Sequence, residues 1–317
     1  MPDSIELDKS ESKTGGPDFS ELANSPLQQL HSPFLTQAEI QLYVKRDDLL
    51  HAEFGGNKWR KLKYNLQFAR QHNHTTLLTF GGAWSNHIYA TAAAGKYFGF
   101  NTIGIIRGER YTRLNPTLQF AEECGMQCHY ITREQYRQKT QPSFLEKLQQ
   151  QFGPVYILPE GGSNALAIDG CAEIVDEVKL MLTKPFDSIC CASGTGATLA
   201  GIISACSENQ TAIGFSALKG GHFLNEEVEK FLSKADQEKN WHIEDRFHFG
   251  GYANTSDELL QFMKDFHAQY DIELDAVYTG KMFYGLFQLI REKYFEAGSC
   301  IVAIHSGGLQ GNKGFDL

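Results

Sequence analysis

The sequence predicts an α/β protein in which parallel sheets are covered by helices on both faces. The first observation is that short apolar runs alternate with helical patterns along the chain, and a repeated strand–helix order is typical of parallel sheets. The second is that the central runs are continuously apolar or β-branched, as strands buried on both faces require. The third is the length of 317 residues, near which single cores divide into two domains.

These patterns predict the elements along the chain. A strand at 40–48 ends in charged residues, and a strand at 75–82 runs into two glycines. A helix of small residues follows at 85–99, and a helix at 114–125 ends at a glycine. The other apolar runs predict strands at 101–108, 126–132, 155–162, 186–196, 211–218 and 300–308. The other helical patterns lie at 57–72, 141–153, 166–183, 197–208 and 280–298.

The composition is typical of a soluble globular protein, with 42% hydrophobic and 21% charged residues. The formal net charge of −9 argues against general binding to nucleic acid or to anionic membranes, because both depend on basic surface. This charge leaves room for a local basic pocket.

The N-terminal segment and the cysteines predict a cytoplasmic protein. Residues 1–24 are rich in Ser, Asp, Glu and Gly, so we expect a flexible tail without the apolar region of a signal peptide. The seven cysteines are an odd number, and we interpret them as reduced thiols. We expect Cys124, Cys128, Cys190 and Cys191 to be buried. No run approaches the roughly 18 apolar residues that a membrane-spanning helix needs.

Four of the predicted strands end in glycine pairs or polar clusters. These ends are residues 81–87, 159–164, 192–198 and 304–308. Ligands of open α/β sheets bind beyond the carboxyl ends of the strands. We therefore expect these four segments to converge on one site.

The stretch "SGTGATLAG", residues 193–201, follows a strand and opens a helix. Gly194 and Gly196 allow a tight bend whose N–H groups turn inward, and the helix adds its N-terminal dipole. The pattern predicts a phosphate site, with a plain structural turn as the alternative. It also resembles a dinucleotide fingerprint, but Glu208 follows too early for the acidic residue of that motif.

A basic stretch at 53–66 contains Lys58, Arg60, Lys61 and Lys63. Lys58 lies at a glycine-to-helix junction, where an amine can be held at a pocket edge and desolvated for Schiff-base chemistry. The other three cations follow on a helix with a periodic apolar side, and we predict that they form a solvated helix face.

Ser85, Asn86 and His87 stand at the start of a predicted helix. They are either an ordinary N-terminal cap or a site in which hydroxyl, amide and free N–H groups bind a carboxylate. A Ser–His hydrolase is disfavoured because the Gly-x-Ser-x-Gly elbow is absent. We predict no metal site, since His72 and His74 lack an evident third ligand.

Together these stretches resemble the fold-type II pyridoxal phosphate enzymes, the tryptophan synthase β-like superfamily. Within it, the chain is similar to the group of D-cysteine desulfhydrase and 1-aminocyclopropane-1-carboxylate deaminase. The resemblance covers about residues 25–309, through "KRDDLL", "GGNKWRKL", "SNH", "PEGGSNAL", "ASGTGATLAG", "VYTGKMFYGL" and "IHSGG". It implies a large cofactor-binding domain (25–57 and 158–317), a small domain (58–157), pyridoxal 5′-phosphate in the cleft between them, and a homodimer.

The resemblance also implies roles for matching positions. Lys58 would carry the cofactor and act as the base at the substrate Cα, and Ser306 would face the pyridine nitrogen. The implied cofactor-binding residues are Lys58, Asn86, Gly194, Thr195, Gly196, Ala197, Thr198 and Ser306. The implied substrate-binding residues are Ser85, Asn86, His87, Tyr252 and Tyr278. The implied catalytic residues are Lys58, Ser85, Tyr252 and Tyr278, with both tyrosines as candidates for proton handling.

Thr279 separates the two activities of the group. The deaminases carry a glutamate after the tyrosine of the "YxGK" motif, close to the pyridine nitrogen, whereas the desulfhydrases carry threonine, as here. A hydroxyl stabilises a ring cation less than a carboxylate does, which suits β-elimination. We therefore favour a lyase that converts a small amino acid into a 2-oxo acid and ammonia, with sulfide from D-cysteine.

Other activities stay open at this stage. The segment after "SNH" lacks the arginine that the family usually has two residues on, and Ile88 and Tyr89 follow instead. The alternatives are 1-aminocyclopropane-1-carboxylate deaminase, another lyase or racemase of this fold, a nicotinamide-dependent oxidoreductase using residues 193–201, and a non-catalytic binding protein.

Overall fold

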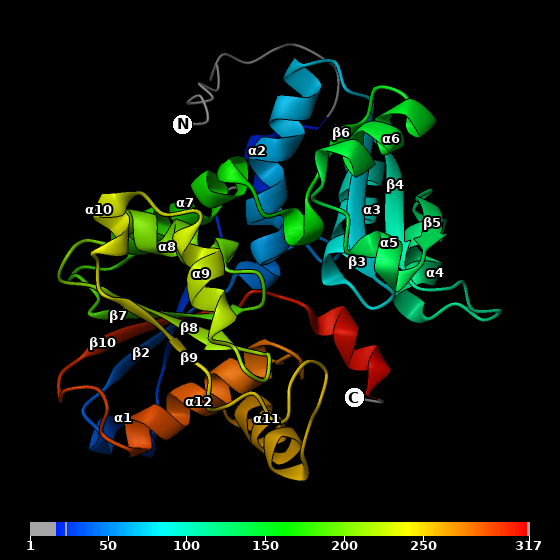
Figure 1. Cartoon of the computed structure of the whole chain (residues 1–317). Coiled ribbons are helices and arrows are strands. Elements are labelled where there is room, and N and C mark those ends of the chain that lie inside the picture. The colour runs from blue at the N-terminus through cyan, green and yellow to red at the C-terminus, as the bar shows by residue number, and fades with distance from the viewer. Residues whose placement is uncertain (1–16, 23, 316–317) are drawn as a thin grey trace.

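The computed structural model describes residues 17–22 and 24–315, which contain two β-sheets (Figure 1). The larger sheet has, in spatial order, β1 (Leu27–Leu30), β2 (Gln41–Lys45), β10 (Cys300–Ile304), β7 (Ser188–Ser193), β8 (Thr211–Ser216) and β9 (Trp241–Glu244). The smaller sheet has β5 (Gln127–Ile131), β4 (Asn101–Arg107), β3 (Thr76–Gly82) and β6 (Tyr156–Ile157). Only β1 pairs antiparallel among the described strands. The predicted α/β class with largely parallel sheets is confirmed.

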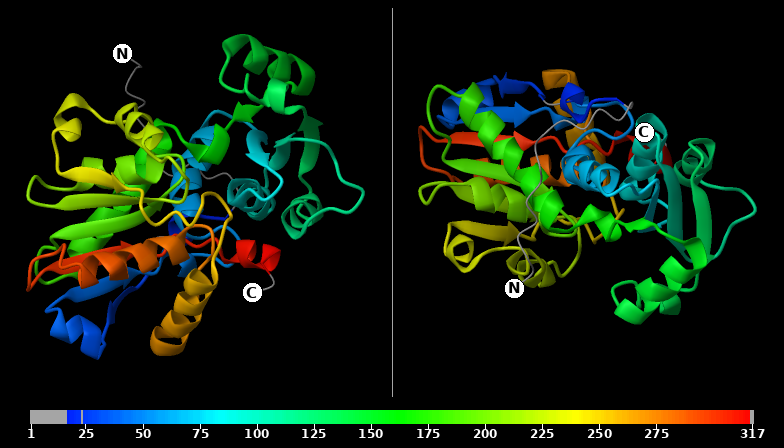
Figure 2. Two further views of the ribbon diagram at one scale, coloured as in Figure 1. Left: turned by 60° about the horizontal axis from the view of Figure 1, so that its bottom comes forward. Right: turned by 90° about the horizontal axis from the view of Figure 1, so that it is seen from above.

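Helices cover both sheets. Those beside the larger sheet are α1 (Pro33–Gln37), α7 (Ala165–Met181), α8 (Ala197–Ala205), α9 (Phe223–Glu229), α10 (Lys234–Gln237), α11 (Asp257–Tyr270) and α12 (Thr279–Arg291). Those beside the smaller sheet are α3 (Asn86–Phe98), α4 (Pro116–Glu123), α5 (Arg133–Tyr136) and α6 (Pro142–Phe152). The helix α2 (Asn57–Gln71) lies between the two sheets, and Figure 2 shows the two lobes from further directions. Short 3-10 turns occur at Phe19–Leu22, Asp47–Leu49, Glu160–Gly162 and Leu309–Gly314.

Local signals explain where several helices begin. Ser85, Asn115 and Asn164 each accept a hydrogen bond from the backbone N–H three residues on, which satisfies a donor that the helix itself leaves free. Thr132 and Gln135 exchange such bonds reciprocally at the start of α5.

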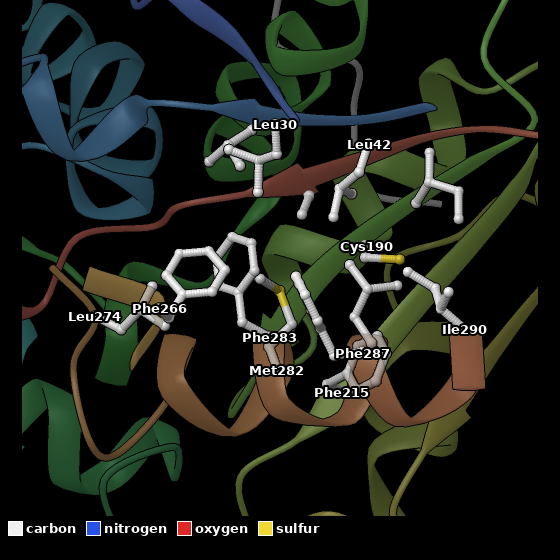
Figure 3. Packing of buried hydrophobic residues seen from close by; sticks show 14 of the residues in the cluster. Leu30, Leu42, Cys190, Phe215, Phe266, Leu274, Met282, Phe283, Phe287 and Ile290 are labelled. Carbon is white, nitrogen blue, oxygen red and sulfur yellow. The ribbon is translucent and has the colours of Figure 1, made fainter. Parts of the chain in front are cut away.

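Two apolar layers bury the faces of the larger sheet. In Figure 3, Met282, Phe283, Phe287 and Ile290 of α12 point toward the sheet, where they pack with residues including Leu42. The opposite face packs against α7 and α8. The neighbours Cys190 and Cys191 belong to opposite layers because successive strand side chains alternate. Both are buried as predicted, whereas Cys124 and Cys128 are only partly buried.

The structure corrects the prediction in several regions, and the short elements β1, α1 and α5 were not predicted. Most of the predicted tail, residues 1–24, lies outside the described residues, but Phe19 is buried and stacks on Phe98 at a ring separation of 4.7 Å. No element was predicted between residues 219 and 279, where α9, α10, β9 and α11 lie. The helical spacing of apolar residues was visible in the sequence of α11, which buries Leu259, Met263, Phe266 and Tyr270 on one face.

The chain starts in the larger sheet, builds the smaller sheet between residues 76 and 157, and returns to the larger sheet at β7. The division into domains at residues 58 and 158 stays a prediction. In the described part of the chain, no helix is both long enough and apolar enough to cross a membrane.

Candidate active site

A cavity of about 700 Å³ lies at the carboxyl ends of strands from both sheets. All four predicted segments contribute to its wall, through residues of 82–87, 160–161, 192–198 and 306–308. The predicted convergence of these strand ends is therefore confirmed. Parallel strands produce it, because their carboxyl ends lie at the same edge of a sheet.

Lys58 stands in the first turn of α2 and reaches the cavity wall. Gly56 lies two residues before Lys58 and has a φ of 69°. A Cβ at this position would lie 1.9 Å from the carbonyl oxygen of Ser306. Only glycine permits this close approach, which brings the start of α2 against the end of β10. The Lys58 amine donates to Asn57 Oδ1 at 2.8 Å, and Asn57 Nδ2 donates to Thr198 Oγ1 at 3.1 Å.

The environment of Lys58 favours a neutral amine. Two causes lower the pKa of Lys58 to about 7: burial has the larger effect, and the positive charge of Lys61 has the smaller one. An ordinary lysine titrates near 10.4. A substantial fraction of this amine is therefore unprotonated and nucleophilic at neutral pH.

Lys61 also lines the cavity, which contradicts its predicted place on a solvated face. Its side chain is 2% exposed, and burial lowers its pKa. The amine donates to the Gly161 carbonyl oxygen at 3.3 Å and to Thr195 Oγ1 at 3.2 Å. The spacing of three residues from Lys58 was the available signal, because i and i+3 share one helix face.

Arg60 and Lys63 are not solvated either, so the prediction of a solvated face is wrong for all three cations. Arg60 is 1% exposed and donates two hydrogen bonds of 2.9 Å to Asp47 and two to Glu177, one of them at 2.8 Å. Lys63 forms an ion pair with Glu173 at 2.8 Å. Both glutamates belong to α7, more than 100 residues away, which is why the helical pattern alone could not reveal them.

The glycine-rich turn joins β7 to α8 at the cavity wall. Gly196 has φ of 77°, and no side chain caps α8. Gly194, Thr195, Gly196 and Thr198 line the cavity, whereas the predicted Ala197 does not. With the amine of Lys61 beside them, these donors fit a phosphate group.

Ser85, Asn86 and His87 reach the cavity at the start of α3. Ser85 is the N-terminal cap and accepts from the Ile88 N–H at 3.3 Å, so the cap interpretation holds alongside any binding role. Thr79 Oγ1 donates to the Leu158 carbonyl oxygen, so His87 Nε2 carries the proton in its 2.8 Å contact with Thr79.

His87 is therefore a poor partner for a carboxylate. Its Nδ1 is left as an unpartnered acceptor within the described residues. Burial, and then the charges of Lys58 and Lys61, hold the pKa of His87 well below its usual range. A neutral ring with a bare acceptor repels an anion, so the backbone N–H groups of α3 are the donors that this segment offers.

Tyr252, Tyr278 and Ser306 complete the predicted set in the wall. The rings of Tyr252 and Tyr278 meet edge to face with centroids 6.1 Å apart. Burial raises the pKa of both phenols, so they hold their protons at neutral pH. Each can therefore donate a hydrogen bond or a proton.

Asp275 is a residue that the sequence analysis missed. Its carboxylate accepts from the N–H groups of Val277, Tyr278 and Thr279 at 2.7–3.0 Å, and from the Thr279 hydroxyl at 2.7 Å. Thr279 is fully buried and is not part of the cavity wall. The expectation that its hydroxyl lies beside the pyridine nitrogen is therefore not supported by its position.

The donor set fits pyridoxal 5′-phosphate. Phosphate can be held by Lys61, by the hydroxyls of Thr195 and Thr198, and by N–H groups of the glycine-rich turn. The amine of Lys58, with its lowered pKa, can hold the aldehyde carbon. The hydroxyl of Ser306 and the amide of Asn86 remain on the wall for the pyridine ring.

Comparisons with known proteins agree with this site. The sequence pattern described as "Pyridoxal-phosphate dependent enzyme" matches residues 20–307, so the chain belongs to the pyridoxal-phosphate dependent enzyme family. The bifunctional D-cysteine desulfhydrase/1-aminocyclopropane-1-carboxylate deaminase of Arabidopsis thaliana is 31% identical over 310 residues, which cover 90% of this chain and 77% of the relative. The D-cysteine desulfhydrase of Salmonella paratyphi A is 28% identical over 288 residues, which cover 84% and 87%.

A solved structure extends the likeness to the fold. The crystal structure of a homologue of 1-aminocyclopropane-1-carboxylate deaminase matches with a TM-score of 0.80 and 27% identity, covering 95% of this chain and 97% of that one. The chain is therefore an enzyme that uses pyridoxal phosphate and has the tryptophan synthase β-like fold. The nicotinamide-dependent alternative is set aside.

Proposed function

We propose that the chain is a D-cysteine desulfhydrase-like lyase that removes the β substituent of a small amino acid. The products are a 2-oxo acid and ammonia, with sulfide when the substrate is cysteine. The observation that carries the proposal is the Lys58 amine. Its pKa is lowered, so the nitrogen is nucleophilic, and it donates to Asn57, which in turn donates to Thr198 beside the glycine-rich turn. Two similar proteins with this activity in their names support it.

Pyridoxal phosphate, when bound, supplies an electron sink for charge that develops at the substrate Cα. The Lys58 amine takes the proton from Cα, since a group of pKa about 7 is well matched to proton transfer at neutral pH. Tyr278 and Tyr252 keep their phenolic protons and can donate one to the departing β substituent. Ser85 and the N–H groups at the start of α3 bind the substrate carboxylate.

The remaining roles in this proposal belong to cofactor binding. Lys61, Thr195 and Thr198 hold the phosphate together with backbone N–H groups of residues 194–198. Asn86 and Ser306 line the cavity, where Asn86 would donate to the 3′-oxygen of the bound cofactor and Ser306 would face its pyridine nitrogen. We also propose the two domains predicted from the sequence, a homodimer and a cytoplasmic location. Light scattering after size-exclusion chromatography tests the dimer.

A substrate screen tests the activity. Purified protein supplied with pyridoxal phosphate is incubated with D- and L-amino acids and with 1-aminocyclopropane-1-carboxylate, and 2-oxo acid, ammonia and sulfide are measured. We expect equal amounts of the three products from D-cysteine and none from Lys58→Ala. Borohydride reduction followed by peptide mapping should find the cofactor mass on Lys58.

The second candidate is the deaminase, which the names of similar proteins favour. Faster conversion of the cyclopropane substrate to a four-carbon 2-oxo acid would replace the desulfhydrase proposal with it. If no amino acid gives a product although the cofactor is bound, both lyase hypotheses fail and the chain is a non-catalytic binding protein of the same fold.

A further inference from the structure

Arg107 is a cation of the cavity wall to which no role has been given so far. It is the last residue of β4 and pairs in register with Gly82 at the end of β3. Gly82 leads directly into the loop before α3, whose first residues are proposed to bind the substrate carboxylate. The parallel register therefore places Arg107 beside that loop, on the same edge of the sheet.

Two contacts define where the guanidinium lies. A Cβ at Gly82 would be 3.3 Å from Nη2 of Arg107, so the guanidinium lies over the backbone of that glycine. Its Cζ is 5.5 Å from the ring centroid of Tyr136, an arrangement in which the ring supports the cation. Burial raises the pKa of Tyr252, and the charge of Arg107 opposes this rise, so the cation acts on a tyrosine proposed to border the substrate.

The charge of Arg107 has no partner of opposite sign in the described part of the chain. No ion pair of Arg107 occurs within residues 17–22 and 24–315. The nearby Glu160 lines the cavity but is taken by Lys139 at 3.2 Å and by the Tyr136 hydroxyl at 2.7 Å.

Two further carboxylates line the cavity. Asp48 is held by Arg46 at 2.7 Å. Glu53 is exposed, and its charge acts on His51 and Tyr89. No carboxylate of the described residues therefore forms an ion pair with the guanidinium, and its N–H groups can donate to an anionic ligand.

We propose that Arg107 binds an anionic group on the substrate side chain, so that among amino acids of equal size the enzyme prefers those whose side chain carries a negative charge. This inference rests on the proposed function, in which Lys58 and the start of α3 take the amine and the carboxylate common to all amino acids. Arg107 then remains for a second anion, and the absence of a side chain at Gly82 leaves room for its guanidinium.

Calorimetry on the holoenzyme tests the proposal with charged and neutral ligands of equal size. The ligands are aspartate against asparagine and glutamate against glutamine, each as both enantiomers, so that each pair differs by one charge. We expect at least one acid to bind about tenfold more tightly than its amide, as a charge-assisted hydrogen bond provides. Arg107→Gln should remove this preference without changing the affinity for the amide, and Arg107→Lys should keep part of it.

Arg110→Gln is the matched control. Arg110 is also an exposed arginine, but it pairs with Glu122 and does not line the cavity, so its loss removes the same charge elsewhere. The acid preference should persist in this variant. Equal affinities of acid and amide in the unaltered enzyme, a preference that survives Arg107→Gln, or no binding of any of the four amino acids would each overturn the proposal.

A 2-oxo acid assay on the same enzyme preparations separates the two hypotheses. Its substrate is D-cysteine, because none of the four titrated amino acids carries a β leaving group. An intact charge preference without product from D-cysteine or any other amino acid of the substrate screen would refute the proposed lyase and leave the assignment of Arg107 standing. Product formation without a charge preference would refute the assignment alone.

Discussion

Lys61 donates a hydrogen bond of 3.2 Å to the hydroxyl of Thr195, 134 residues further along the chain. This contact ties α2, which carries Lys58, to the glycine-rich turn between β7 and α8. The helix that holds the reactive amine and the turn proposed to hold the phosphate are thus positioned by the same side chain.

Lys61→Met should weaken binding of pyridoxal phosphate. The variant removes a buried cation from the phosphate site, and a hydrogen bond to a charged group is worth about 1.5–3 kcal/mol, or roughly 10- to 100-fold in the dissociation constant. Fluorescence titration of the cofactor-free protein measures this constant. Lys63→Met is the control, because Lys63 lies on the same helix as Lys61 but pairs with Glu173 of α7 and lies outside the cavity wall. Equal losses in both variants would contradict the assignment of Lys61.

The reactivity of Lys58 should depend on pH with a midpoint near 7. Its pKa of about 7 means that the amine gains its nucleophilic form as pH rises through neutrality, well below the value of about 10.4 for an exposed lysine. Competitive acetylation of the cofactor-free protein, read by mass spectrometry for each lysine, measures the midpoint. Lys61→Met should move it upward, because the positive charge of Lys61 lowers the pKa. A midpoint near 10 in the unaltered chain would exclude the neutral amine.

Breaking the buried pair of Arg60 and Asp47 should strongly destabilise the fold. Arg60→Met leaves the carboxylate of Asp47 buried with one cation fewer, and loss of one partner of a buried pair costs about 3–5 kcal/mol. Urea unfolding measures the free energy of unfolding. Arg246→Met, which breaks the more exposed pairs with Glu244 and Glu292, should cost no more than about 1 kcal/mol. Similar costs for the two variants would mean that the buried pair is not structural.

Asp275→Asn should lower turnover more than substrate affinity. The amide has one acceptor oxygen in place of two, so it cannot satisfy the three N–H groups and the Thr279 hydroxyl that the carboxylate holds. Tyr278 would lose its fixed position, and we expect kcat to fall about tenfold or more, as for misplacement of a catalytic group. Steady-state kinetics separates kcat from KM. Asp257→Asn in the first turn of α11 is the control for a lost charge at a helix start.

Much of the site could be predicted from the sequence because its parts are local. The glycine-rich turn, the cap of α3 and the junction before Lys58 each depend on a few consecutive residues whose backbone conformations are restricted by their type. The order of strands and helices then places all of these parts at one edge, and the cavity wall contains every predicted site residue except Ala197 and Thr279. The helical period of α11 was available in the sequence and was missed, whereas α9, α10 and β9 are only four to seven residues long and carry few apolar positions.

The sequence by itself determined the α/β class, the elements that end at the cavity, and Lys58 as the amine at a glycine junction. Only the tertiary structure decided which groups the charged side chains around this amine contact. Arg60 and Lys63 meet carboxylates of α7, Lys61 turns to Thr195, and Arg107 lies over Gly82. A helical pattern shows which residues share a face, but burial and pairing depend on which distant segment covers that face.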